Sequence, residues 1–211
     1  MTNNNSTKII EKRADIYKLL SLLYYQPNAD TAGYVKELKE LISDYIYSGT
    51  EFMDKMEKDL AKTSANANYL LVDYAKLFVG PFDVLAAPYG SIYLDNERKV
   101  MGDSTMDACR QYAEAGLEID ASFKEAPDHI AVELEFLYYL NYRYLETNEL
   151  MYLVKQEIFL NTHLGLWIDD FTKAVVKHSN TDFYINLTLL TQKFIKEDMQ
   201  FLKNLPGTKA N

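Results

Sequence analysis

Apolar residues recur at every third or fourth position through most of the chain, a spacing that gathers them on one face of an α-helix. In the first such segment Ile9, Ile16 and Leu20 share a face. Pro27 then ends the segment. No segment alternates apolar and polar residues as a half-buried strand would. The pattern therefore predicts an all-α protein, a compact bundle of roughly eight to ten helices. The predicted helices span residues 8–25, 31–47, 51–61, 66–79, 104–115, 127–145, 148–177 with a break near 165, and 182–205.

One long stretch, residues 80–103, interrupts the helical pattern. Its prolines and glycines exclude one regular helix, yet apolar and aromatic residues continue through it. Long apolar connections either pack over the core or carry function, and the pattern leaves both interpretations open. Tyr89 and Tyr93 are candidates for ligand contact because they lie in this stretch and not in a helical stripe.

The two ends of the chain differ from the rest. Residues 1–7 are polar and residues 206–211 begin with a helix-ending proline, so both segments are predicted to be tails. Between them, residues 8–205 are predicted to form one domain, which suits a chain of 211 residues. A polar link at residues 118–126 divides this domain into two halves.

Charge and composition narrow the classes of function. The chain carries 22 basic and 31 acidic residues, a net charge of −9, which disfavours nucleic acid as a partner. The most apolar stretch, residues 69–78, is interrupted by Asp73 and Lys76, so no membrane span is predicted. A single cysteine, Cys109, excludes an internal disulfide and a thiolate metal site.

The chain contains none of the common catalytic, metal-binding or phosphate-binding motifs. The pair Asp128-His129 at the start of a predicted helix is the remaining candidate. Asp128 could simply cap this helix, and His129 could pair with Glu133 one turn on. Alternatively, the carboxylate and the imidazole could engage a cationic or polar ligand. No nucleophile accompanies the pair, so we predict no catalytic residue, no metal site and no cofactor.

Five motifs follow one another between residues 74 and 171. They are Tyr74-x-x-Leu77-Phe78-x-Gly80-Pro81, Pro88-Tyr89-x-Ser91-Ile92-Tyr93-Leu94-Asp95, Gly102-x-x-Thr105 with Arg110 and Tyr112, Pro127-Asp128-His129-Ile130-x-x-Glu133-Leu134-x-Phe136-Leu137, and His163-Leu164-x-x-Trp167-x-x-x-Phe171. In this order they resemble the TorD/DmsD family of chaperones for molybdenum-containing oxidoreductases, with the nitrate reductase chaperone NarJ as a more distant relative. The resemblance covers about residues 10 to 205.

The resemblance implies a TorD-like, all-helical chaperone of the cytoplasm. Such a protein binds the twin-arginine leader peptide of an apo-molybdoenzyme of the dimethyl sulfoxide reductase type, and it delays export until the molybdopterin cofactor is inserted. Some relatives exchange halves, so the resemblance implies a monomer or a domain-exchanged dimer, with residues 118–126 as the candidate hinge. The residues that it implies for peptide binding are Tyr74, Leu77, Phe78, Pro88, Tyr89, Ser91, Tyr93, Asp128, His129 and Glu133.

Two positions depart from the family's pattern. Gly90 stands where many members carry Glu, and Pro127 directly precedes Asp128 where members often have one residue between. The general chemistry still agrees, because a leader with two guanidiniums beside an apolar stretch needs an apolar groove, a carboxylate and a negative field.

Three alternatives to a leader-binding chaperone stay open at this stage. A NarJ-like chaperone would serve a non-exported oxidoreductase subunit, whose amino terminus would lack a full twin-arginine leader. A small hydrolase or nucleotide-dependent enzyme would use Asp128 and His129, and it would lose turnover in His129→Ala. A purely structural helical subunit would bind no peptide.

Overall fold

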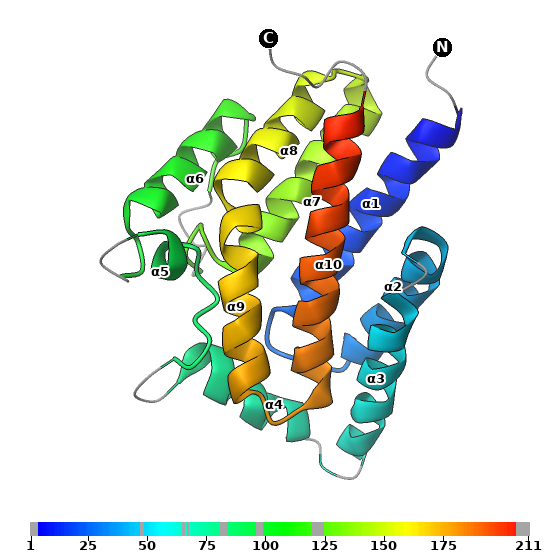
Figure 1. Cartoon of the computed structure of the whole chain (residues 1–211), viewed down its shortest axis with the longest axis vertical. Helices are drawn as coiled ribbons and strands as arrows, with labels where there is room; N and C mark the ends of the chain where they lie inside the picture. The colour runs from blue at the N-terminus through cyan, green and yellow to red at the C-terminus, as the bar shows by residue number, and fades with distance from the viewer. Residues whose placement is uncertain are drawn as a thin grey trace.

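Ten α-helices make up most of the described chain, and their order is shown in Figure 1. The computed structural model describes residues 4–46, 49–64, 66, 68–80, 84–95, 99–119 and 125–205. The helices are α1 (Asn4–Leu23), α2 (Thr31–Tyr45), α3 (Thr50–Leu60), α4 (Tyr69–Tyr74), α5 (Ser91–Leu94), α6 (Asp103–Glu114), α7 (Ile130–Thr147), α8 (Met151–Thr162), α9 (Leu164–His178) and α10 (Asp182–Asn204). A 3-10 turn, η2 (Ala61–Ser64), follows α3, and a π-helix, η3 (Ala75–Val79), follows α4.

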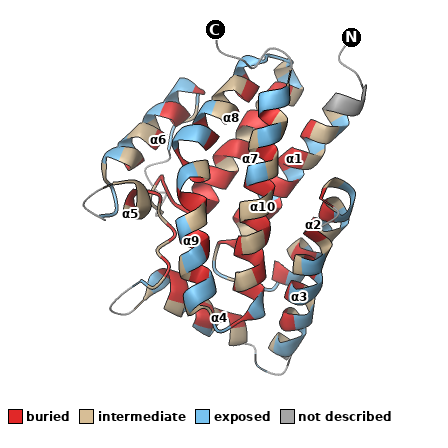
Figure 2. Ribbon diagram, viewed as in Figure 1, coloured by how far each residue is buried: buried red, intermediate tan, exposed pale blue. Residues whose placement is uncertain are grey.

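Helix α7 runs through the bundle, with α1 packed along one side and α8 along another. Helix α10 contacts α3, α8 and α9, and α6 packs against α5 and α8. Figure 2 shows the buried residues on the faces where these long helices meet. This arrangement confirms the predicted all-α fold class, because every long apolar stripe finds a neighbouring helix.

A buried ion pair joins α1 to α10 inside the bundle. Arg13 and Asp198 are both fully buried, and the Arg13 guanidinium donates to both oxygens of the Asp198 carboxylate. Tyr17 donates its hydroxyl to the same carboxylate at 2.6 Å, and Arg13 also donates to Gln156 of α8 at 2.9 Å. Because each buried charge has its counter-charge and further hydrogen bonds, the group fixes the register of three helices.

Two buried carboxylates hold the turn between α9 and α10 against the helices beneath it. Asp73 of α4 accepts hydrogen bonds from the backbone N–H groups of Asn180 and Thr181 at 3.0 Å. Asp59 of α3 accepts the N–H of Phe183 in the first turn of α10 at 2.9 Å. Carboxylates at these positions satisfy N–H groups that the start of a helix leaves unpaired. Asp73 thus attaches α4, and Asp59 attaches α3, to the turn that precedes α10.

The helix boundaries agree with the predicted ones to within a few residues, with two differences. Helix α1 already begins at Asn4, four residues before the predicted start at residue 8. The segment 66–79 is divided into α4 and the π-helix η3, which ends where Gly80 takes a positive φ of 57°. The segment 148–177 is two helices separated at His163, which agrees with the predicted break near residue 165.

Other predictions on domain organisation fall partly outside the described residues. The tail at residues 206–211 and most of the candidate hinge, residues 120–124, lie there, as do residues 1–3. None of the helices in the described part of the chain combines the length and the apolar character needed to cross a lipid bilayer.

Asp198→Ala is expected to lower the free energy of unfolding by about 3 to 5 kcal/mol, because it leaves the buried Arg13 guanidinium without its counter-charge. Denaturant titration of the purified protein measures this change. Asp170→Ala is the matched control: it removes an exposed carboxylate that pairs with Lys173 at 2.7 Å, and it should change stability by less than about 0.5 kcal/mol. Equal effects of the two substitutions would contradict a stabilising role for the buried pair.

Candidate functional site

A short antiparallel bridge joins the irregular stretch to the start of α7. The N–H of Ile130 donates to the carbonyl of Pro88 at 2.8 Å, and the N–H of Gly90 donates to the carbonyl of Asp128 at 2.9 Å. The bridge pairs Tyr89 with His129, and their ring centroids lie 5.3 Å apart. The structure therefore brings together the two sequence segments from which the site was predicted.

Asp128 faces the interior and not the surface. Its side chain is fully buried, and its Oδ2 accepts the N–H of Ser91, the first residue of α5, at 2.7 Å. Asp128 therefore caps α5, and not the helix that follows it in the sequence as predicted. In this conformation an arginine outside the protein cannot reach its carboxylate.

His129 is the residue that caps α7. Its Nδ1 accepts the N–H of Ala131 at 3.2 Å, so this nitrogen carries no proton and the Nε2 carries one. Burial lowers the pKa of His129 to about 4, against an opposing effect of the Asp128 carboxylate. His129 is thus neutral near pH 7. It does not pair with Glu133, which points elsewhere.

Two tyrosines enclose the His129 ring, and each reaches a glutamate. Tyr25 of α1 stacks on the ring at 6.1 Å and donates its hydroxyl to Glu135 at 3.1 Å. Tyr89 meets the ring edge-on, and its hydroxyl lies 3.4 Å from Glu125. These four side chains are partly exposed, and we call them the tyrosine–glutamate surface. The surface offers two carboxylates and two aromatic rings at one place.

Tyr74 adjoins this surface from the end of α4. Burial, together with the nearby Glu125 carboxylate and the Tyr89 hydroxyl, raises the pKa of Tyr74 to about 12. Its ring packs edge-on against Phe78 at 5.4 Å. Burial also raises the pKa of Glu135, and the hydrogen bond from Tyr25 partly offsets this. A cation beside Glu135 would favour its charged form.

An apolar groove of about 270 Å³ begins beside Glu135. It lies between the end of α6 with its following residues and the outer face of α7. Its lining residues are Tyr112, Leu117, Glu118, Ile119, Val132, Glu135, Phe136 and Tyr139. Because Glu135 belongs to both, the groove continues the tyrosine–glutamate surface along α7.

Most of the other predicted site residues belong to the core. Leu77 is fully buried, and Phe78 is 5% exposed among Phe171 and Tyr184. Tyr93 is partly exposed but stacks on Trp167 at 5.6 Å. The core also takes Pro88, Ser91 and Glu133. Of the predicted set, Tyr74 and Tyr89 are the residues that a peptide outside the protein could touch at the tyrosine–glutamate surface.

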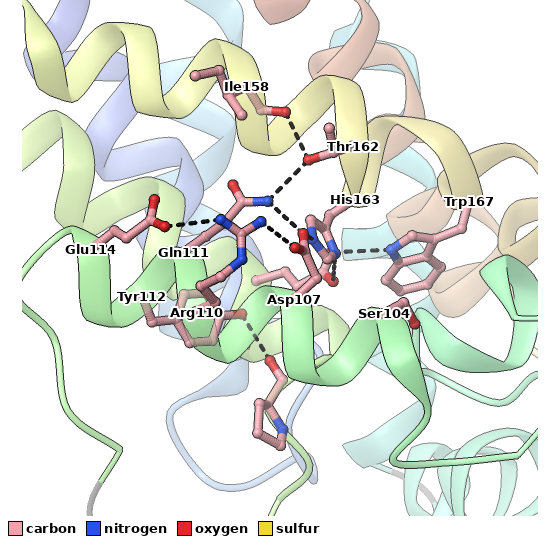
Figure 3. A network of polar contacts seen from close by, with 12 residues as sticks. Ser104, Asp107, Arg110, Gln111, Tyr112, Glu114, Ile158, Thr162, His163 and Trp167 are labelled. Carbon is pink, nitrogen blue, oxygen red and sulfur yellow. Dashed lines mark hydrogen bonds and ion pairs between the residues drawn. The ribbon is translucent and has the colours of Figure 1, made fainter.

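Figure 3 shows a network of polar side chains that connects α6 with α8 and α9. His163 lies at the junction of α8 and α9, and its Nε2 is hydrogen-bonded to Oδ2 of Asp107 of α6 at 2.9 Å. The indole N–H of Trp167 donates to Oε2 of the fully buried Glu133 at 3.0 Å. Gly90 packs on this pair: a Cβ atom there would lie 3.0 Å from Nε1 of Trp167 and 3.2 Å from Oε1 of Glu133. A side chain at position 90 therefore has no room without a shift of Trp167 or Glu133.

Comparison with known proteins places the chain in a family. The model of the nitrate reductase delta subunit family matches residues 29–173, more than half of the chain. The chain belongs to this family. The chaperone protein TorD of Aliivibrio fischeri is 27% identical over 215 residues, covering 94% of this chain and 98% of that protein. TorD of Shewanella oneidensis is 29% identical over 219 residues, covering 94% of each.

Solved structures give the same answer for the fold. The crystal structure of a candidate redox enzyme maturation protein from Archaeoglobus fulgidus superposes with a TM-score of 0.51 and 23% identity, covering 90% of this chain and 94% of the other. The family match and the TorD relatives confirm the predicted resemblance to the TorD/DmsD family. The relatives are named chaperones, which agrees with the predicted non-enzymatic role of this TorD-family protein.

The sequence prediction missed three residues of the tyrosine–glutamate surface: Tyr25, Glu125 and Glu135. Tyr25 and Glu135 are separated by 110 positions, and no spacing rule connects them. They meet only because α1 packs along α7. Glu125 carried a weak signal, since it lies four positions before His129 in a polar link.

Gly90→Ala is expected to lower the free energy of unfolding by about 1 to 3 kcal/mol, because the added methyl group overpacks the contact with Trp167 and Glu133. Gly33→Ala provides the matched control: this glycine lies inside α2 with nothing within 4 Å of an added Cβ. Alanine there should raise stability by about 0.5 to 1 kcal/mol through helix propensity. Thermal or chemical unfolding of both variants measures these changes. A Gly90→Ala variant as stable as wild type would contradict the close packing.

The stability of wild type relative to His129→Gln is expected to fall as the pH drops from 7 toward 4. The unfolded chain takes up the His129 proton near pH 6.5, whereas the folded chain resists it down to about pH 4. The free energy of unfolding of wild type relative to His129→Gln is therefore highest above pH 6.5, and it is lower by about 2 to 3 kcal/mol at pH 4.5. Urea titrations of both proteins across this range measure it. A difference that does not change with pH would show that His129 titrates normally.

Proposed function

We propose that this TorD-family chaperone serves the maturation of a redox enzyme by binding the leader peptide of its apo-form at the tyrosine–glutamate surface. The observation that carries the proposal is the position of Glu125 and Glu135. Each accepts a hydrogen bond from a partly exposed tyrosine that packs on His129, and Glu135 also lines an apolar groove.

The chemistry of this surface suits a guanidinium group. A carboxylate can accept two parallel hydrogen bonds from arginine, and a tyrosine ring attracts a cation to its face. Two carboxylates and two rings on one surface would accommodate the two arginines of a twin-arginine leader. The net charge of −9 adds a long-range attraction for such a peptide.

The apolar part of the leader would occupy the groove that begins at Glu135. Val132, Phe136 and Tyr139 recur on one face of α7 at helical spacing, and Leu117 and Ile119 form the opposite wall. A peptide that places its arginines near Glu125 and Glu135 would thus pass directly onto apolar side chains. This order, cations first and an apolar stretch after, is the order within a twin-arginine leader.

The role of the Asp-His pair differs from the one predicted. Asp128 and His129 would support the surface from below: Asp128 fixes α5, and His129 fixes the start of α7 between Tyr25 and Tyr89. The same bonds argue against the hydrolase alternative, because Oδ2 of Asp128 and Nδ1 of His129 each accept a backbone N–H and the two side chains are not hydrogen-bonded to each other as an acid–base couple would be.

We further propose a client, a compartment and an oligomeric state for this chaperone. A client of the dimethyl sulfoxide reductase type, action in the cytoplasm, and a monomer or a domain-exchanged dimer are carried over from the TorD/DmsD likeness. A NarJ-like role with a non-exported subunit is the second candidate. A chaperone of this kind would bind its partner through the groove and not through Glu125 and Glu135. A leader whose arginines are replaced by glutamine would then bind as well as the native leader, whereas the twin-arginine proposal expects weaker binding.

Calorimetric titration with a synthetic twin-arginine leader tests the proposal. The double variant Glu125→Gln/Glu135→Gln should weaken binding by about tenfold or more, and Tyr89→Ala by about tenfold, since each removes charge-assisted or cation–π contacts. Glu51→Gln is the control. It also removes an exposed negative charge, but Glu51 lies on α3 and is not part of the tyrosine–glutamate surface. Unchanged affinity in the double variant, or an equal loss in Glu51→Gln, would contradict this site.

A further inference from the structure

Two buried polar atoms behind the site face each other without a hydrogen bond. The Nδ1 of His163 and the Oε1 of Glu133 are 3.7 Å apart. Neither atom has a hydrogen-bond partner among the described residues, and the two side chains are 2% and 0% exposed. An unpaired buried polar atom lowers the stability of the folded state, so one proton shared by these atoms would give both of them a hydrogen-bond partner.

Asp107 decides which nitrogen of His163 carries a proton. Partial burial works against its ionisation, but hydrogen bonds from Arg110, His163 and Gln111 hold the pKa of Asp107 well below its usual range. An ionised carboxylate only accepts, so Nε2 of His163 must donate to it. Burial lowers the pKa of the His163 ring, which leaves Nδ1 as an acceptor directed at Glu133.

Glu133 is placed to supply the matching donor. Its Oε2 already accepts the indole N–H of Trp167, so a proton on the carboxyl group belongs on Oε1, the oxygen that faces His163. Burial raises the pKa of Glu133 well above its usual range, the Trp167 bond opposes this, and the nearby Asp128 carboxylate reinforces it.

The other groups around the pair include one further acceptor, Oδ1 of the buried Asp128, which has no hydrogen-bond partner among the described residues. Phe159 stacks on the His163 ring at 4.6 Å, and Tyr112 donates its hydroxyl to the carbonyl of Pro127. The cation Arg110 engages Asp107 and Glu114 on α6. Asp128 acts on both groups through its field, raising the pKa of each. The proton is assigned to Glu133 and His163 because their two unpaired atoms approach each other at 3.7 Å.

We propose that Glu133 and His163 hold one proton between Oε1 and Nδ1, and that this pair positions the segment 88–94 from beneath. The proton either stays on Glu133 or moves to His163; the pair remains neutral overall in both cases, because the carboxylate that forms is balanced by the imidazolium. Glu133 is thus a positioning residue and not a contact for the peptide.

The contact that transmits this effect is the packing of the segment on Trp167. Tyr93 stacks on the indole with an interplanar angle of 7°, and Gly90 rests against both Trp167 and Glu133. The Trp167–Glu133 hydrogen bond fixes the indole, so the neutral pair fixes the platform on which Tyr89 is carried. If the pair lost its shared proton altogether, the Glu133 carboxylate would be a buried charge without a counter-charge, and it would draw in water or a cation and displace Gly90.

The variant Glu133→Gln tests the proton directly, because an amide can accept from Trp167 and donate to His163 as a protonated acid does. The folded state keeps the Glu133 proton above the pH at which the unfolded chain loses it. The stability of wild type relative to Glu133→Gln should therefore fall as the pH rises from 4.5 to 8. Carbon-13 NMR of labelled glutamate carboxyl groups, assigned by difference from the variant, should show a Glu133 resonance that stays at its protonated position or moves together with a His163 ring signal. A carboxylate that ionises near pH 4.5 while His163 stays neutral would overturn the proposal.

The positioning role rests on the proposed function and has its own measurement. Glu133→Gln should bind the leader within about twofold of wild type at pH 7, whereas Glu133→Ala should bind about tenfold more weakly. Equal loss in both variants would overturn the role of the proton. If wild type binds no leader, the proposed function fails, while the NMR and stability curves still decide whether the pair shares a proton.

Discussion

The bridge between Pro88–Gly90 and Asp128–Ile130 is the interaction on which the site depends. Two backbone hydrogen bonds and the capping of α5 by Asp128 attach an irregular segment to the first turn of α7. Without this attachment Tyr89 would have no fixed relation to His129, and the two glutamates would have no shared surface. The segment can be irregular because its polar backbone groups find partners at a helix start, where N–H groups are otherwise unpaired.

The placement of acidic groups separates structure from recognition. Asp59, Asp73 and Asp198 are buried with hydrogen-bond donors directed at them, and their charges hold helices and a turn together. Glu125 and Glu135 are partly exposed, and each lies near one tyrosine. A carboxylate that keeps free acceptor capacity at the surface can accept a guanidinium, whereas one saturated in the core cannot. The same residue type therefore serves two purposes according to its burial.

Gly90 shows how one position connects the two layers of the site. Many TorD/DmsD members are expected to carry Glu there, but in this chain the position packs against Trp167 and Glu133. A glutamate would need the indole and the buried acid to give way. In the proposed binding mode the acidic contacts lie instead at Glu125 and Glu135, both of which are partly exposed. The loss of an acidic side chain at one position is thus compatible with a surface that still attracts cations.

The sequence by itself determined the fold class, most helix boundaries and the two segments that form the site, because helical periodicity and proline or glycine breaks are local properties of the chain. It did not determine which side chains are accessible. Asp128 and Phe78 belong to family motifs yet are buried, while Tyr25 and Glu135 belong to no motif and meet across 110 positions. Burial and long-range pairing follow from how α1 and the 88–94 segment pack on α7, and helix packing depends on the whole set of apolar faces at once. For this reason the tertiary structure alone decided which carboxylates are free to bind.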